Sequence, residues 1–306
     1  MGVKDIAEKN LEAWNDVFAD IVNVLLFKGK RIVHENELEN DTKDSMLKAD
    51  GGVHEQERDV SKFWKNGEIR ISILGFENQT VQDYKMPLRV ISYDGASYKQ
   101  QLLDKKSRKN YPVATLVLYF GTDSKWSAPK NLLECFDVPE TLKPFVSDYK
   151  INVFNIAWLS DKTTEMFQSD FKFIAKYFQT KRKNKKYVPT NEEIKHVDSL
   201  LKMFSTLTGD NHFEAIYNNS ILSKKGGVTM CDIVQSFVNE GIERGIEEGI
   251  ERGIEEGIER GIEKGKAELI ANLIESDAGS IEQIAAWVKL PVSEVKKLAE
   301  KVQTKA

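Results

Sequence analysis

The chain contains only two cysteines, Cys135 and Cys231, among its 306 residues. Two thiols cannot build a disulfide framework or a cysteine-rich zinc site, so an intracellular, reducing compartment is expected. No apolar run approaches the roughly 20 residues that a membrane span requires, and the N-terminus lacks an apolar signal core. The sequence therefore predicts a cytoplasmic protein that has no membrane partner.

The chain also lacks a Walker-type phosphate loop and an excess of positive charge. It has 48 acidic and 44 basic residues, a net charge of −4 that argues against a strongly basic nucleic-acid-binding domain. The excess lies in residues 241–265, which contain eight Glu and four Arg or Lys and leave 40 residues of each sign elsewhere. A neutral body can present a basic cleft, so the charge balance does not exclude DNA.

Residues 241–265 carry glycine at every fourth position, and isoleucine follows each of the first six glycines. Glu and Arg favour helix, whereas each glycine opposes it by about 1 kcal/mol relative to alanine. The repeat therefore predicts either a solvated linker, helical or disordered, or a helix that packs against its copy in a homodimer. A partner that follows the isoleucines would wind with right-handed sense, because the four-residue period exceeds 3.6.

Two short helices are predicted after the repeat. Ser280 and Gln283 form a capping-box pattern, and Ser293 can cap a second helix beyond Pro291. This pair is either a plain helical hairpin or a helix-turn-helix reader of DNA.

The earlier part of the chain alternates helical and strand patterns. Residues 8–28 have an apolar stripe at helical spacing, with Glu12, Asp16, Asp20 and Asn23 on the other side. Further expected elements are a helix over 86–103, strands over 111–120 and 151–156, and a mainly helical stretch over 162–225.

A β-hairpin is predicted at Asn66-Gly67, between two segments rich in β-forming residues. Its second strand has a buried face whose parity is shared by Ile69, Ile71, Ile73, Glu77 and Gln79. A carboxylate and an amide on the inward face of an apolar strand favour a functional site over solvent-exposed decoration.

The register of the hairpin decides whether Asp59 can join Glu77. With a two-residue loop, Asp59 lies opposite Leu74 and faces away from Glu77. A three-residue loop at 66–68 or a bulge at Gly75 reverses that parity and lets the two carboxylates converge on one cation. Such oxygen ligands suit Mg²⁺ or Mn²⁺; the competing interpretation is that both carboxylates make surface hydrogen bonds.

The same residues resemble a known family. Asp59 followed by Glu77-x-Gln79 is similar to the active-site pattern of PD-(D/E)XK nucleases. The longer string resembles the Rpn family of recombination-promoting nucleases, which are also described as transposases; it comprises Gly75, Phe76, Glu77, Asn78, Gln79, Thr80, Asp83, Met86, Pro87, Leu88, Arg89, Tyr93, Asp94 and Tyr98. The resemblance covers about residues 10–275.

The resemblance implies an α/β fold with a restriction-endonuclease-like core in αβββαβ order, a mixed sheet with flanking helices, and a C-terminal helical region. We expect a nuclease core over 1–160, a helical subdomain over 161–230, and the repeat with its hairpin over 231–306. Asp59 and Glu77 would hold Mg²⁺, for which Mn²⁺ could substitute. Gln79 stands where the superfamily usually has lysine and would position water or phosphate.

A metal-dependent DNA endonuclease that acts in recombination or transposition is therefore the leading hypothesis, with DNA and a second copy of the chain as partners. The alternative is a non-catalytic, oligomeric DNA-binding or regulatory protein that retains the fold. Candidate DNA contacts, each of which could instead be a solvated surface charge, are Arg89, Lys181, Arg182, Lys183, Lys185 and Lys186.

Overall fold

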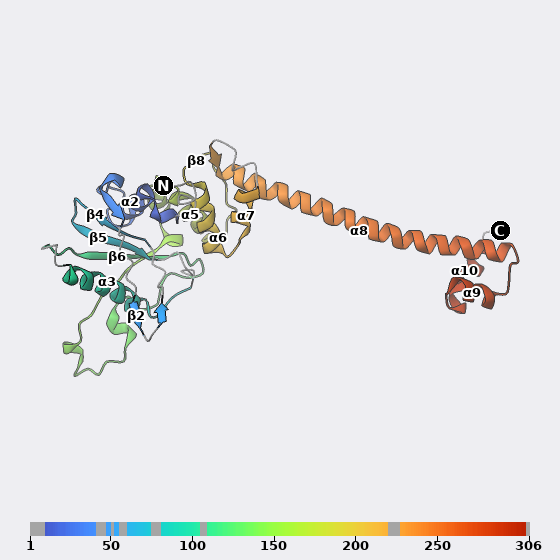
Figure 1. Cartoon of the computed structure of the whole chain (residues 1–306), viewed down its shortest axis with the longest axis horizontal. Coiled ribbons are helices and arrows are strands. Elements are labelled where there is room, and N and C mark those ends of the chain that lie inside the picture. The colour runs from blue at the N-terminus through green and yellow to red at the C-terminus, as the bar shows by residue number, and fades with distance from the viewer. Residues whose placement is uncertain are drawn as a thin grey trace. The chain divides into compact units, whose positions relative to one another are not determined.

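The computed structural model describes residues 10–40, 47–49, 52–54, 60–74, 81–104, 109–219 and 227–303. The chain divides into two compact units, Met1–Ser236 and Phe237–Ala306, and each is described by itself. Figure 1 labels the main elements of both units.

The first unit is built on a mixed five-stranded sheet in the order β1-β4-β5-β6-β7. β4 runs antiparallel to both β1 and β5, whereas β5, β6 and β7 are mutually parallel. Two small antiparallel pairs, β2 with β3 and β8 with β9, accompany it. The strands are β1 (Leu38–Asn40), β2 (Leu47–Ala49), β3 (Gly52–His54), β4 (Ser61–Trp64), β5 (Ile69–Leu74), β6 (Val113–Tyr119), β7 (Asn152–Asn155), β8 (Glu193–Ile194) and β9 (Val228–Thr229).

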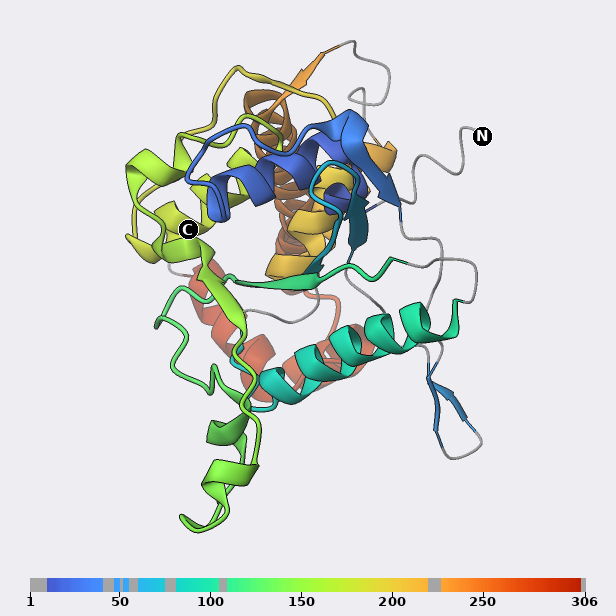
Figure 2. The ribbon, with the colours of Figure 1, turned by 90° about the vertical axis from the view of Figure 1, so that its left-hand side faces the viewer.

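Helices cover both faces of this sheet. The α-helices are α2 (Asn15–Leu25), α3 (Met86–Leu103), α4 (Asp161–Thr164), α5 (Phe171–Arg182), α6 (Val197–Thr208), α7 (His212–Asn219) and α8 (Met230–Glu275). Short 3-10 helices are η1 (Leu11–Ala13), η2 (Glu35–Glu37), η3 (Leu132–Cys135), η4 (Lys143–Phe145) and η5 (Ile156–Trp158). Figures 1 and 2 show α2 on one face of the sheet and α3 on the other.

Alternate residues of the central strands pack against these two layers. Leu74 and Val117 form a buried cluster with Met86 and Val90 of α3. Ile71 pairs with Lys62, whose amine lies over the Phe18 ring of α2. The sheet is therefore buried on both faces, as expected for parallel strands flanked by helices.

Most of the predicted elements are confirmed. The helix over 86–103 has the expected bounds and carries Pro87 in its first turn. The predicted strands over 111–120 and 151–156 correspond to β6 and β7. The predicted helical stretch contributes buried aromatic and apolar side chains to the core, namely Phe167, Phe171, Phe173, Ile174 and Phe178.

The predicted polar side of the first helix is wrong. Glu12, Asp20 and Asn23 are at most 3% exposed. The side chain of Asn23 accepts from the backbone N–H of Val33 and donates to its carbonyl, and Asp20 accepts from the backbone of Gln168. These backbone groups are the hydrogen-bonding partners of buried polar side chains that the periodic pattern predicted to be solvent-exposed.

The predicted hairpin is confirmed, and its register is that of an even-numbered loop. Residues 65–68 form the turn, which is closed by the pair Trp64↔Ile69, and Ser61 lies opposite Ser72. Ile73 donates to the carbonyl of Val60 at 2.9 Å, so the register holds to the last described residue. The three-residue loop is therefore ruled out, and only a bulge beyond Leu74 would bring Asp59 to the face of Glu77.

The second unit contains most of α8, followed by α9 (Ile281–Val288) and α10 (Val292–Gln303). The repeat is helical, and the predicted capping box of Ser280 and Gln283 is confirmed. Ile270 of α8 packs with Ile284 and Val295, so the two short helices close a small core against the end of α8.

Candidate functional site

The carboxyl ends of β5 and β6 lie at one edge of the sheet, because the two strands are parallel. In open α/β sheets, ligands bind at this edge. A cavity of about 560 Å³ occurs here. It is lined by the segment before α3, the turn after β6, α5 and α6; the residues are Val81, Gln82, Tyr84, Tyr119, Phe120, Gly121, Thr122, Asp123, Ser124, Phe178, Lys181, Leu207 and Thr208.

The side chain of Gln82 connects two walls of this cavity through hydrogen bonds. Its Oε1 accepts from the backbone N–H groups of Ser127 at 2.6 Å and Ala128 at 2.8 Å. Its Nε2 donates to Ser124 Oγ at 3.2 Å and to the carbonyl of Lys125 at 3.3 Å. The segment that enters α3 is thus held against the loop that follows β6.

The turn after β6 depends on glycine. A Cβ atom on Gly121 would lie 2.0 Å from the hydroxyl of Tyr119, so a larger residue requires the backbone or this buried ring to move. The carbonyl of Gly121 accepts from Trp158 Nε1 at 3.1 Å, which fixes the turn against η5.

The residues of the predicted basic run have different surroundings. Lys181 lines the cavity, whereas the guanidinium of Arg182 lies 4.7 Å from the centre of the Trp158 ring. Lys183 forms an ion pair with Asp161, and Lys185 and Lys186 are exposed beyond the end of α5. Within the run, Lys181 is therefore the residue that lines this cavity.

Arg89 lies on the first part of α3 and pairs with Asp83 at 3.2 Å. Burial lowers the pKa of Arg89, but its contacts with Tyr93 and Asp83 outweigh this effect and raise the pKa. Arg89 is thus already engaged by a carboxylate close to it in the chain.

Asp59, Glu77 and Gln79, the predicted metal and catalytic residues, lie outside the described residues. In the chain, Glu77 and Gln79 fall between Leu74, the last residue of β5, and Val81, which lines the cavity. Among the residues that the structure describes, no group of three or more His, Cys, Asp or Glu side chains could hold a metal ion.

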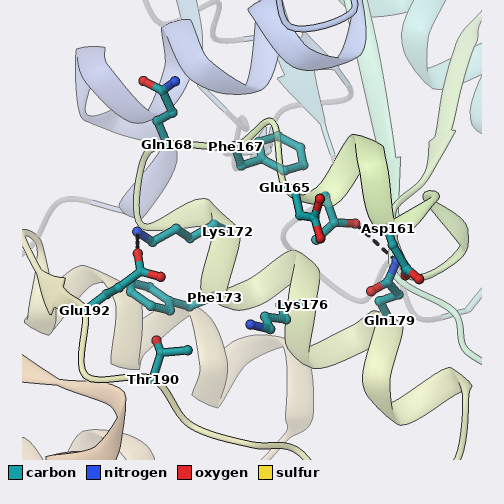
Figure 3. Close-up of a pocket in the computed structure, with 11 residues that line it drawn as sticks. Asp161, Glu165, Phe167, Gln168, Lys172, Phe173, Lys176, Gln179, Thr190 and Glu192 are labelled. Atoms are coloured by element: carbon teal, nitrogen blue, oxygen red, sulfur yellow. Dashed lines mark hydrogen bonds and ion pairs between the residues drawn. The ribbon is translucent and has the colours of Figure 1, made fainter.

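A second cavity, of about 530 Å³, lies along α4 and α5 and was not anticipated from the sequence (Figure 3). Three of its charged residues form ion pairs: Lys172 pairs with Glu192 across the cavity, and Asp161 pairs with Lys183 outside the lining. The amide of Gln179 donates to the carbonyl of Leu159 at 2.9 Å. These contacts tie α5 to its neighbours, so we assign this cavity a structural role.

His196 is packed inside a polar network, and its side chain is 7% exposed. Its ring stacks on Trp14 with centroids 4.1 Å apart and contacts Asp16 at 3.0 Å. Burial raises the pKa of Asp16, but hydrogen bonds and charge from His196 and Lys195 outweigh it and hold the pKa well below its usual value. The residues of this network lie far apart in the sequence, so only their chemical types could have indicated it.

Asp94, part of the family-like string, is 2% exposed. It accepts from Thr115 Oγ1 at 2.6 Å and from the hydroxyl of Tyr149. Burial raises the pKa of Asp94, and these two hydrogen bonds lower it without cancelling the rise. The contacts join α3, β6 and the segment before β7, which indicates a structural role for Asp94.

Residues 65–211 match the protein-family model described as "Putative transposase, YhgA-like". No curated protein and no solved structure matches the chain. The matched segment runs from the hairpin turn through α6; it includes Glu77 and Gln79 and begins after Asp59. The match confirms the family resemblance predicted from the sequence. Within the described residues, no helix is long and apolar enough to cross a membrane.

Proposed function

We propose, from the premise that this chain carries the YhgA-like transposase segment, that it is a metal-dependent DNA endonuclease acting in transposition or recombination. The order of elements supports a nuclease core. Along the chain, α2, β1, β4, β5, α3 and β6 follow the αβββαβ order that the resemblance implies, with the β2–β3 pair inserted.

The observation that carries the proposal is the cavity at the carboxyl ends of β5 and β6. Val81 lines it, and Gln79 precedes Val81 by two residues, so their Cα atoms are at most about 7 Å apart. Glu77 precedes Val81 by four residues. A short segment of chain therefore connects Glu77 and Gln79 to a cavity whose lining also includes Lys181.

The donor chemistry fits a hard cation, since Asp59 and Glu77 provide carboxylates and Gln79 an amide oxygen. The observed hairpin register adds one condition, a bulge at Gly75, for both carboxylates to reach one ion. Bound Mg²⁺, or Mn²⁺ in its place, would activate water and neutralise phosphoryl charge. Gln79 would orient water or phosphate, and Lys181 would supply the positive charge that Gln79 lacks.

The test is cleavage of supercoiled plasmid by the full-length protein with Mg²⁺, with EDTA, and after Glu77→Ala or Glu77→Gln. We expect Mg²⁺-dependent nicking that EDTA abolishes and that both substitutions reduce by at least about 100-fold, a loss typical of removing a catalytic group. Nicking that both Glu77 variants retain would contradict the assigned site.

A DNA-binding assay over a range of salt concentrations separates this proposal from a non-catalytic DNA-binding protein. Binding that weakens steeply with salt, combined with no cleavage under any divalent metal, would establish the non-catalytic alternative. Lys181→Ala should weaken DNA binding, whereas Lys172→Ala, which breaks an ion pair in the second cavity, should leave it unchanged.

A further inference from the structure

Because the repeat in α8 is four residues long, its four positions form four rows along the helix. With about 100° per residue, the isoleucine row lies about 100° to one side of the glycine row. The fourth position of each repeat lies about 60° to the other side, and the third position lies at the back. The third position is always Glu, whereas the fourth reads Arg244, Glu248, Arg252, Glu256, Arg260 and Lys264.

The glycine face of this helix is open within its unit. A Cβ atom placed on any glycine from Gly241 to Gly265 would meet no atom within 4 Å. The six neighbouring isoleucines, from Ile242 to Ile262, are each 52–58% exposed. A regular apolar row beside a groove without side chains is the surface that lets two helices approach closely.

The charged row distinguishes between the two orientations of a helix pair. In an antiparallel pair the same sides of the two helices meet. The isoleucines of one copy then lie against those of the other, and the charged row, which is the fourth position of each repeat, lies against the charged row of the other copy running in the opposite direction. Arg252 then faces Glu256 of the second copy, and Glu248 faces Arg260, so opposite charges meet at four of the six positions. A parallel pair would instead place the charged row against the isoleucines.

We propose that the repeat forms an antiparallel, right-handed helix pair with the repeat of a second copy of this chain, with the two glycine rows in the seam. The two-fold axis lies level with Ile254, midway between Arg252 and Glu256. The isoleucine row forms an i±4 ridge and the glycines an adjacent i±4 groove, and such ridges interlock with a right-handed crossing. The Glu row faces solvent and keeps the assembly soluble.

Pairing of two copies also explains how a helix of low intrinsic stability can form. Glycine at every fourth position disfavours an isolated helix, and the exposed pairs Arg252–Glu248 and Arg260–Glu256 add little. Packing along the seam supplies what the single helix lacks. This proposal does not depend on DNA cleavage, because its readouts report association alone.

Cysteine cross-linking of the full-length protein tests the orientation. In a Cys135→Ser, Cys231→Ser background, Ile250→Cys and Ile258→Cys are placed on separate, differently tagged copies that are co-expressed and oxidised. The proposed antiparallel pair predicts a 250–258 cross-link between copies and none between two Ile250→Cys chains, whose positions are about 12 Å apart along the axis. Cross-linking of Ile250→Cys to itself would overturn the orientation, and a monomeric parent protein by light scattering would overturn the pair.

A matched set of substitutions tests the seam. Replacing Gly249, Gly253 and Gly257 by alanine raises helix propensity but blocks close approach, and should weaken dimerisation by at least about tenfold. The control replaces Glu251, Glu255 and Glu259 by alanine at the back of the same turns and should leave the dissociation constant within about threefold. Equal effects of the two sets would contradict a glycine seam.

Discussion

Lys62 illustrates how single residues are held in this fold. Its side chain is completely buried, and its amine donates to the carbonyl of Ala13 at 2.8 Å and to Asn15 Oδ1 at 2.7 Å. A buried ammonium group is tolerated only when such acceptors surround it. These two acceptors lie more than 40 residues earlier in the chain, and a third, Asn40 Oδ1 at 2.5 Å, lies 22 residues earlier, so no local sequence pattern accounts for the burial of Lys62.

Gln82→Ala is expected to destabilise the fold by about 0.5–1.5 kcal/mol, because it removes the acceptor for the partly solvent-accessible backbone donors of Ser127 and Ala128. Urea denaturation measures this change in the free energy of unfolding. Gln168→Ala, which removes an exposed glutamine, is the control and should change stability by less than about 0.5 kcal/mol. Equal stability of the two variants would contradict the role of Gln82 in connecting the segment before α3 with the loop after β6.

Asp16 should make stability depend on pH in the acid range. Because its pKa in the folded state is depressed, its ion pairs stabilise the protein above the usual Asp pKa of about 4, and this contribution is lost as the pH falls. The advantage of the wild-type protein over Asp16→Asn in free energy of unfolding should therefore shrink from pH 6 toward pH 3. An advantage that stays constant over this range would disprove the assignment.

At the scale of elements, regular periodicity made the sequence informative. The bounds of α3, the strand β6 and the hairpin at Asn66-Gly67 follow from turn chemistry, proline position and apolar spacing. No strand was predicted at β1, because it is only three residues long and its place is set by pairing with β4. The cavity at the sheet edge also escaped prediction, since α5 and α6 reach it only through tertiary packing.

Two glycines in different elements should respond oppositely to alanine. A Cβ atom on Gly67 would lie 2.1 Å from the ring of Trp64, so Gly67→Ala should destabilise the protein by about 1–3 kcal/mol. Gly95 lies inside α3 with open space around it, so Gly95→Ala should stabilise by up to about 1 kcal/mol. Thermal denaturation of both variants decides this; a destabilising Gly95→Ala would be inconsistent with the packing described for α3.

At the scale of the whole molecule, sequence and structure contribute different parts of the functional proposal. The sequence supplies the family resemblance and the candidate residues Asp59, Glu77 and Gln79, whereas the structure supplies the sheet edge, the cavity and the register. The sequence did not determine the register of the hairpin, because it is compatible with either loop length. It now restricts how Asp59 and Glu77 could share one ion.

Metal-dependent nicking by wild-type protein and by Asp59→Ala, compared at concentrations that give equal DNA binding, tests the central claim most directly. We predict that the wild-type protein nicks plasmid DNA with Mg²⁺ and that Asp59→Ala binds the same DNA but loses at least about 100-fold in rate. Equal nicking by the two proteins would remove Asp59 from the mechanism and contradict the proposed metal site.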